Sequence, residues 1–100
     1  MQIRLTSAAE LDLQDGFVFY EMQQQTLGSY FLDSVYADID SLILYAGVHA
    51  KPLGRFHRAL AKRFPFAIYY EVADQIVTVV AVLDCRQNPG TVKEIGRAHV

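Results

Sequence analysis

The chain has 100 residues, of which 52% are apolar and 20% are charged, which fits one small globular domain. Its single cysteine, Cys85, excludes an internal disulfide, and three scattered histidines give no metal-ligand spacing. No apolar stretch approaches the ~18 residues needed to cross a bilayer, and the N-terminus lacks a basic flank followed by an apolar signal core. These features predict a cytoplasmic protein with no membrane segment, no metal and no cofactor.

Charge is distributed unevenly along the chain, although the net charge is only -2. Residues 1–50 hold one cation against seven acids, and residues 51–100 hold eight cations against four acids. The segment 51–63 carries five cations and a histidine without any acid. Clustered cations raise the local concentration of anions, so this segment indicates contact with phosphates or an acidic surface. The alternative is a strand edge that its Lys and Arg side chains protect from aggregation.

The first half of the chain predicts a short strand at 2–5 followed by two helices. Ser7 and Glu10 have the spacing of a capping box, which predicts that the first helix begins there. Its apolar stripe consists of Ala9, Leu13, Phe17 and Tyr20, while Asp12, Asp15 and Gln23 are expected to face water. We expect Gly16 to allow close approach of a neighbouring element.

A second helix is predicted after a break at residues 26–29, and Gly47 is expected to end it. Its buried stripe is Phe31, Val35, Ile39, Leu42, Ile43 and Ala46. Two amphipathic helices joined by a short loop that contains glycine form a helical hairpin.

The second half predicts strands, because residues 66–72 and 76–83 are rich in β-branched and aromatic side chains. The short polar turn 73–75 pairs them as an antiparallel hairpin. The basic segment 55–62 is ambiguous and would supply the third strand of a meander. Strict alternation along 76–83 makes both faces of the last strand apolar. The helical hairpin can cover one face, so the other predicts an apolar surface for a partner. Alternatively, the basic strand and the C-terminal segment cover it.

Four segments, in this order and with these spacings, resemble the RelE/ParE toxins of bacterial type II toxin–antitoxin systems, and the likeness is greatest to the ParE-like branch. They are 19–21 (FYE), 27–32 (LGSYFL), 63–70 (RFPFAIYY) and 80–89 (VAVLDCRQNP). The resemblance covers about Ala9 to Pro89. It implies an α+β fold, a small antiparallel β-sheet with an N-terminal helical hairpin packed on one face, in the order β-α-α-β-β-β.

The resemblance also implies a function. ParE-like members bind DNA gyrase, cause growth arrest, serve in plasmid stabilisation and are neutralised by a cognate antitoxin in a toxin–antitoxin hetero-oligomer. RelE-like members are ribosome-dependent mRNA endoribonucleases, which is the alternative for this chain. A second alternative is an inert interaction module whose charge asymmetry serves solubility and pairing.

Arg86 is the residue most strongly indicated for function, because it matches a basic position present in both branches. The expected target-binding surface consists of Arg55, Arg58, Lys62, Arg63 and Arg86. Arg86 and His57 are the candidate catalytic residues if the protein cleaves RNA, since that reaction needs a cation on phosphate and a proton carrier. RelE-like enzymes carry a tyrosine beyond the arginine, and no tyrosine follows Tyr70 here. The sequence therefore favours binding over catalysis.

The C-terminal residues depart from the family pattern. Residues 95–100 are what the codons ATC GGA AGA GCA CAC GTC encode, which resembles a read through a sequencing adapter. We therefore expect the toxin domain to comprise residues 1–93, and residues 94–100 to be a non-native tail. We therefore expect no function for Arg97 and His99.

Overall fold

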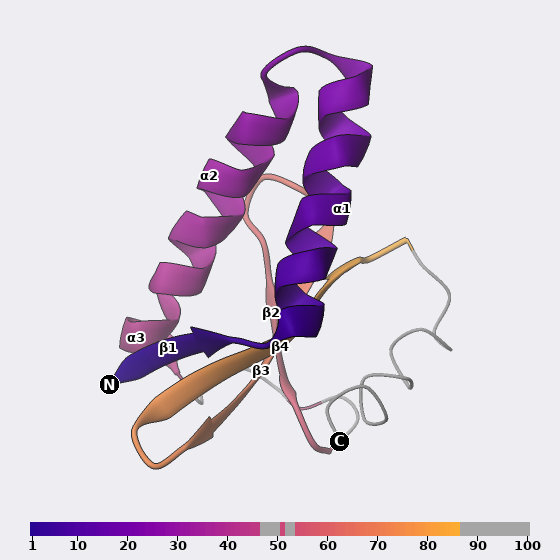
Figure 1. Ribbon diagram of the computed structural model, residues 1–100. Coiled ribbons are helices and arrows are strands. Elements are labelled where there is room, and N and C mark those ends of the chain that lie inside the picture. The colour runs from indigo at the N-terminus through magenta and orange to yellow at the C-terminus, as the bar shows by residue number, and fades with distance from the viewer. Residues whose placement is uncertain (47–50, 52–53, 87–100) are drawn as a thin grey trace.

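A computed structural model describes residues 1–46, 51 and 54–86. The elements are β1 (Gln2–Leu5), α1 (Ser7–Gln23), α2 (Leu27–Asp40), α3 (Leu42–Tyr45), β2 (His57–Leu60), β3 (Phe66–Ala73) and β4 (Ile76–Asp84). The strands form one sheet in the order β1-β4-β3-β2, and the helices lie on one face of it (Figure 1). This confirms the α+β class and the predicted order of elements. The sheet is mixed rather than wholly antiparallel, because β1 runs parallel to β4.

The N-terminus of α1 is capped by Thr6, one residue earlier than predicted. The Thr6 hydroxyl oxygen accepts a hydrogen bond from the amide of Ala9 at 3.1 Å, which satisfies one of the free amides of the first turn. Thr6 has an extended backbone with ψ of 162°, and its amide donates to the carbonyl of Val79 at 3.0 Å. The capping residue is therefore the one that leaves the sheet, and Ser7 is exposed inside the helix.

Two glycines set the close packing of α1 against α2. A Cβ at Gly16 would lie 2.5 Å from the ring of Phe31, and a Cβ at Gly28 would lie 2.7 Å from both the ring and the carbonyl oxygen of Phe17. Each helix thus contributes one glycine that receives a phenylalanine of the other. The prediction for Gly16 is confirmed. The predicted break at 26–29 is wrong in position, because Gly28 lies inside α2.

The connection between the two long helices is held by Glu21. Its carboxylate oxygens accept hydrogen bonds from the amide of Thr26 at 3.0 Å and of Gly28 at 2.9 Å. An anion at a helix N-terminus is favourable because the free amides and the helix dipole point toward it. The loop end of the hairpin extends past the sheet (Figure 1), so this contact stabilises the hairpin where no strand supports it.

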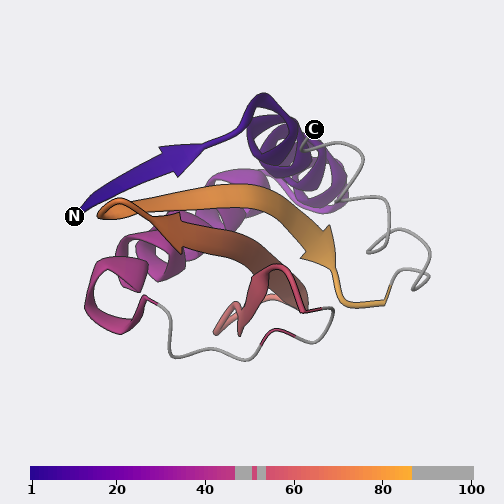
Figure 2. The ribbon, with the colours of Figure 1, turned by 90° about the horizontal axis from the view of Figure 1, so that it is seen from below.

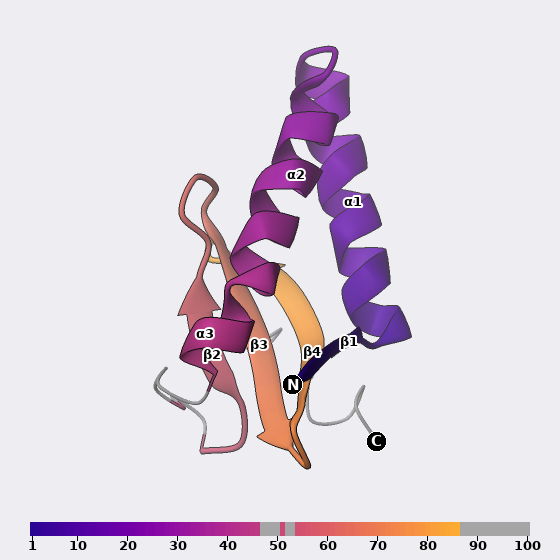
Figure 3. The same ribbon diagram turned by 90° about the vertical axis from the view of Figure 1, so that its left-hand side faces the viewer.

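The main core lies between the helices and the sheet (Figures 2 and 3). Phe31, Val35, Ile39 and Leu42 are buried, as the second predicted stripe requires, whereas Ile43 is 49% exposed and Ala46 is partly buried. The stripe changes because α2 ends at Asp40 and the short α3 begins at Leu42. The predicted end at Gly47 lies outside the described residues.

The β3–β4 hairpin has a two-residue turn at Asp74 and Gln75, which lie within the predicted turn. Both residues have positive φ, 53° and 64°, as a type I′ turn requires. Opposite β3, Tyr69 pairs with Ala81 and Tyr70 pairs with Val79, so β4 contains a bulge at the intervening residue, Val80. The predicted strict alternation is therefore wrong beyond Val79.

The bulge changes which side chains reach each face. Val77, Val79 and Val82 pack in the main core beneath the helices. The opposite face carries a second cluster made of Phe56, Ala67, Tyr69, Val80 and Ala81, each no more than 4% exposed. Phe56 precedes β2 and packs in this cluster with the side chains of the sheet. The predicted open apolar sheet surface is therefore wrong for the described residues.

Candidate functional site

The end of β4 places Arg86 in a fixed ion pair with Asp84. The guanidinium donates to one carboxylate oxygen at 2.8 Å and to the other at 2.5 Å. The Arg86 side chain is 61% exposed while that of Asp84 is 19% exposed. The hydrogen bond from Arg86 lowers the pKa of Asp84, and the same bond raises the pKa of Arg86. Arg86 is thus a permanently charged, oriented and accessible group.

Tyr20 of α1 is the second neighbour of Arg86. Burial raises the pKa of the Tyr20 hydroxyl, and the charge of Arg86 acts in the opposite direction. Tyr20 also packs against Phe31 and Phe64, with ring centroids 5.1 Å and 4.8 Å away. Arg86 therefore lies where the end of β4 meets the aromatic part of the core.

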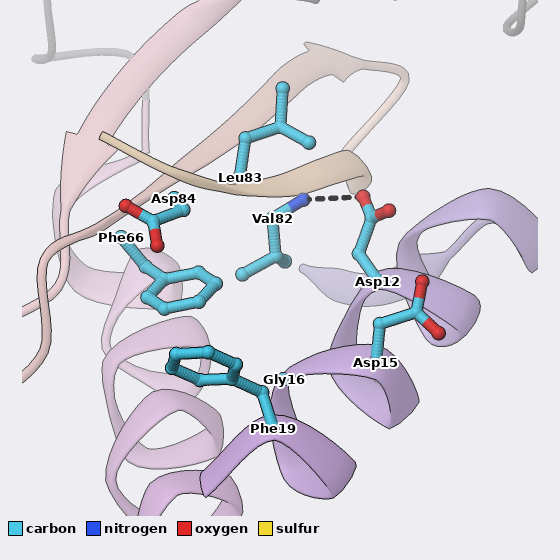
Figure 4. A pocket seen from close by; sticks show the side chains of 8 residues that line it. All are labelled: Asp12, Asp15, Gly16, Phe19, Phe66, Val82, Leu83 and Asp84. Atoms are coloured by element: carbon cyan, nitrogen blue, oxygen red, sulfur yellow. Dashed lines mark hydrogen bonds between the residues drawn. The ribbon is translucent and has the colours of Figure 1, made fainter. Parts of the chain in front are cut away.

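A pocket of about 270 Å³ lies beside this ion pair, between α1 and β4 (Figure 4). Its lining consists of Asp12, Asp15, Gly16, Phe19, Phe66, Val82, Leu83 and Asp84. The rings of Phe19 and Phe66 lie near one another in the pocket, and carboxylates from α1 and β4 stand around them (Figure 4). The pocket is thus apolar inside and acidic at its rim.

Asp12 contacts an edge of β4 that has no neighbouring strand. β1 pairs with β4 only as far as Val79, and the amide of Val82 donates to the Asp12 carboxylate at 2.9 Å. Burial raises the pKa of Asp12 and the nearby charge of Asp15 adds to the increase, while the bond from Val82 opposes it. The prediction that Asp12 faces water is wrong. No local signal marks Asp12, because its partner depends on where β1 ends.

The predicted basic residues do not form one continuous surface. Arg55 stacks over Phe56 at 5.1 Å, and Arg58 donates to the hydroxyl of Tyr69 at 3.0 Å. Both therefore contact the second cluster, on the sheet face away from the helices. Arg58 also reaches the sulfur of Cys85 at 3.7 Å, which links this pair to the end of β4.

Lys62 and Arg63 contact α2 instead. Arg63 donates to the hydroxyl of Tyr30 at 2.9 Å, and the backbone amide of Lys62 donates to the buried carboxylate of Asp38 at 3.0 Å. The amide of Cys85 donates to the carbonyl of Pro65 at 2.7 Å. The connection between β2 and β3 therefore adjoins the end of β4, where Arg86 lies.

His57 and Arg86 lie beside positions of β3 that are far apart. His57 pairs with Tyr70 and Asp84 pairs with Phe66, a separation of four positions or roughly 13 Å along the strand. The His57 ring stacks on Tyr70 with centroids 5.0 Å apart. The two candidate catalytic residues are thus not brought into one site. Among the described residues, no group of three or more His, Cys, Asp or Glu side chains is placed to hold a metal ion.

Comparison with solved structures finds a chain of the "Chromosomal ParDE TA system from P. aeruginosa" with a TM-score of 0.75. The match covers 82% of this chain and 92% of that chain, at 15% sequence identity. The protein therefore has a ParE-like fold. No family model matches the chain, and no curated protein matches it. Within the described residues, no helix is both long enough and apolar enough to cross a membrane.

Proposed function

We propose that this protein is the toxin of a type II toxin–antitoxin system, that it arrests growth by binding DNA gyrase, and that a cognate antitoxin neutralises it in the cytoplasm. The observation that carries the proposal is the ParE-like fold, matched over 82% of the chain to a chain of a ParDE system. The four sequence segments that resemble ParE-like toxins support it as well, because that likeness is one of sequence and does not depend on the fold.

Arg86 is the proposed contact with the target. Its guanidinium is held by Asp84 through two hydrogen bonds, and the exposed side chain retains donors for an acidic group of a second protein. Arg58 lies near the same end of β4, because its guanidinium contacts the sulfur of Cys85. Lys62 and Arg63 are secondary contacts in this proposal, since the connection that carries them adjoins the end of β4 through the bond from Cys85 to Pro65. Arg55 precedes His57 and lies further from Arg86, so it is not part of this contact.

Binding is preferred over RNA cleavage because the proton carriers are poorly placed. His57 is stacked on Tyr70 away from Arg86. Tyr20 interacts with Arg86, but its raised pKa keeps the hydroxyl protonated at neutral pH. A protonated phenol is a weak general base. The alternative function is that of a RelE-like ribonuclease, and the experiment must distinguish it from gyrase binding.

The experiment compares the wild-type protein with Arg86→Ala and with Arg4→Ala, a control that removes an exposed cation from β1. We expect induced wild-type and Arg4→Ala proteins to arrest bacterial growth and to block DNA supercoiling by purified gyrase. Arg86→Ala should lose both effects while it still folds, with only the small loss of stability that follows from breaking an exposed ion pair with Asp84.

Three results would contradict the proposal in different ways. Growth arrest by Arg86→Ala would remove this residue from the target contact. Cleavage of messenger RNA in a translating extract, with supercoiling intact, would favour the ribonuclease. Induction without growth arrest would favour an inert interaction module.

A further inference from the structure

The solvent face of α1 carries apolar side chains that nothing in the described structure covers. Leu11, Val18 and Met22 are 56%, 52% and 83% exposed. They follow the spacing i, i+7, i+11, which places them on one stripe of the helix. Leu13 and Tyr20, which pack into the core, lie on the opposite side. α1 is therefore apolar on two opposite sides, and only the side with Leu13 and Tyr20 is covered within the described residues.

A second feature adjoins this stripe. A pocket of about 340 Å³ between α1 and α2 is lined by Gln14, Phe17, Val18 and Leu32. The close approach of Gly28 to Phe17 holds the two helices together at this place. The pocket lies on the flank of α1 away from Asp12 and Asp15, which line the pocket beside Arg86. This pocket between α1 and α2, called the groove below, and the Arg86 site are therefore separate surfaces.

The charged side chains that α1 and α2 themselves carry are all negative. Residues 5–48 contain seven Asp or Glu side chains and no Lys, Arg or His. Glu10 is exposed one helical turn before Gln14 of the groove, and Asp33 is exposed next to Leu32. A second copy of this hairpin carries the same acidic side chains, and juxtaposed like charges oppose self-docking. Charge complementarity therefore selects a basic partner.

We propose that the outer face of the helical hairpin, formed by Leu11, Val18 and Met22 with the adjoining groove at Phe17 and Leu32, docks a basic amphipathic helix of a second protein. A groove between two packed helices accepts the side-chain ridge of a third helix. The apolar face of that helix covers the stripe, and its cations meet the carboxylates at the rim. This inference does not rest on the proposed toxin activity.

The test uses two synthetic probes of roughly 18 residues, or five helical turns. Both carry leucines at i, i+3, i+4 and i+7, and one has lysine while the other has glutamate at the remaining positions. Fluorescence anisotropy of the labelled peptides measures binding to the whole protein. We expect the lysine peptide to bind, with affinity that falls as salt is added, and the glutamate peptide not to bind.

Val18→Glu places a carboxylate in the centre of the stripe and should weaken binding of the lysine peptide about tenfold or more. The matched control is Leu44→Glu, which adds the same charge at a 78% exposed leucine of α3 and should leave binding unchanged. Because both variants add a negative charge, a difference between them reports apolar contact at the groove. Circular dichroism confirms that both variants fold, since both sites are exposed.

Equal affinity of the wild-type protein and Val18→Glu for the lysine peptide would overturn the proposal. Equal binding of the glutamate peptide would overturn the charge argument. A wild-type dimer in sedimentation velocity that Val18→Glu dissociates would assign the face to a second copy instead. Growth arrest is scored separately through Arg86→Ala, so failure of the toxin proposal is distinguishable from failure here.

Discussion

Two carboxylates in the pocket beside Arg86 have pKa values displaced in opposite directions. Asp12 is partly buried against the edge of β4, and burial raises its pKa. Asp84 accepts two hydrogen bonds from Arg86, which lower its pKa. The same small region therefore contains one carboxylate that destabilises the folded protein when ionised and one that stabilises it.

The difference in the free energy of unfolding between Asp12→Asn and the wild type should shift in favour of the variant as pH rises. A carboxylate with a raised folded pKa contributes stability below its ordinary value of 3.8, and this contribution is lost as pH rises through the folded pKa. The asparagine carbonyl can still accept the bond from the Val82 amide without a charge. Urea unfolding at acidic and neutral pH measures the difference, and a difference that is constant with pH would contradict the assignment.

Asp84→Asn should behave in the opposite sense. A carboxylate with a lowered folded pKa contributes stability above the ordinary value of 3.8, and this is lost as pH falls through the folded pKa. The variant should thus be less stable than the wild type at neutral pH and approach it in strong acid. The same unfolding series tests it, with Asp74→Asn in the exposed turn as the control.

The place of Arg86 just after the last strand could be predicted from the sequence, whereas the contact of Asp12 with β4 could not. The position of Arg86 follows from its own strand, which is a local property. Asp12 acquires its partner because β1 stops at Leu5 and leaves the Val82 amide free. That arrangement joins residues 70 positions apart, so no pattern within α1 could indicate it.

At the scale of elements, the helical hairpin depends on close contact at its two glycines. Gly28→Ala should lower the free energy of unfolding by about 1–3 kcal/mol, because the new Cβ meets the backbone carbonyl of Phe17 at 2.7 Å. The gain in helix propensity, about 1 kcal/mol, offsets part of this loss. Ser29→Ala, at the next and exposed position, is the control. Chemical denaturation that shows equal stability for the two variants would contradict this packing.

The β3–β4 turn offers a stabilising change. Gln75 has φ of 64°, which costs a non-glycine residue about 1–2 kcal/mol. Gln75→Gly should therefore raise the free energy of unfolding by about 1 kcal/mol, since it gives the Asp-Gly pair favoured in type I′ turns. Urea denaturation measures the gain, and a loss of stability would show that the glutamine side chain has a role that the backbone does not reveal.

The strands of this hairpin were predictable from composition, but the bulge at Val80 was not. Ile76 to Leu83 is apolar at nearly every position, so the sequence contains no polar residue that marks a shift of register. The bulge is fixed by pairing with β3, and it decides that Val80 and Ala81 pack with Tyr69 in the second cluster.

At the scale of the whole molecule, the two-layer arrangement was predictable because periodicity, turn residues and segment resemblance agreed. The mixed sheet was not, since nothing in residues 2–5 specifies a parallel partner. The described core is formed entirely by residues 9–82. The predicted domain boundary at Lys93 lies outside the described residues and remains a proposal.

A chain that ends at Lys93 should therefore unfold at the same denaturant concentration as the full chain. The members of both buried clusters among the described residues all lie between Ala9 and Val82, so they remain when residues 94–100 are removed. A clear loss of stability in urea would show that the C-terminal residues belong to the folded domain.

The pairing of β1 with β4 has a consequence for synthesis on the ribosome. The helical hairpin can begin to form while the nascent chain is still growing, because its contacts are close in sequence. Gln2–Leu5 must wait until Ile76–Val79 has emerged before it finds its neighbour. β1 is therefore translated before the other strands of the sheet but is among the last to reach its native place, and the sheet cannot close before β4 has been synthesised.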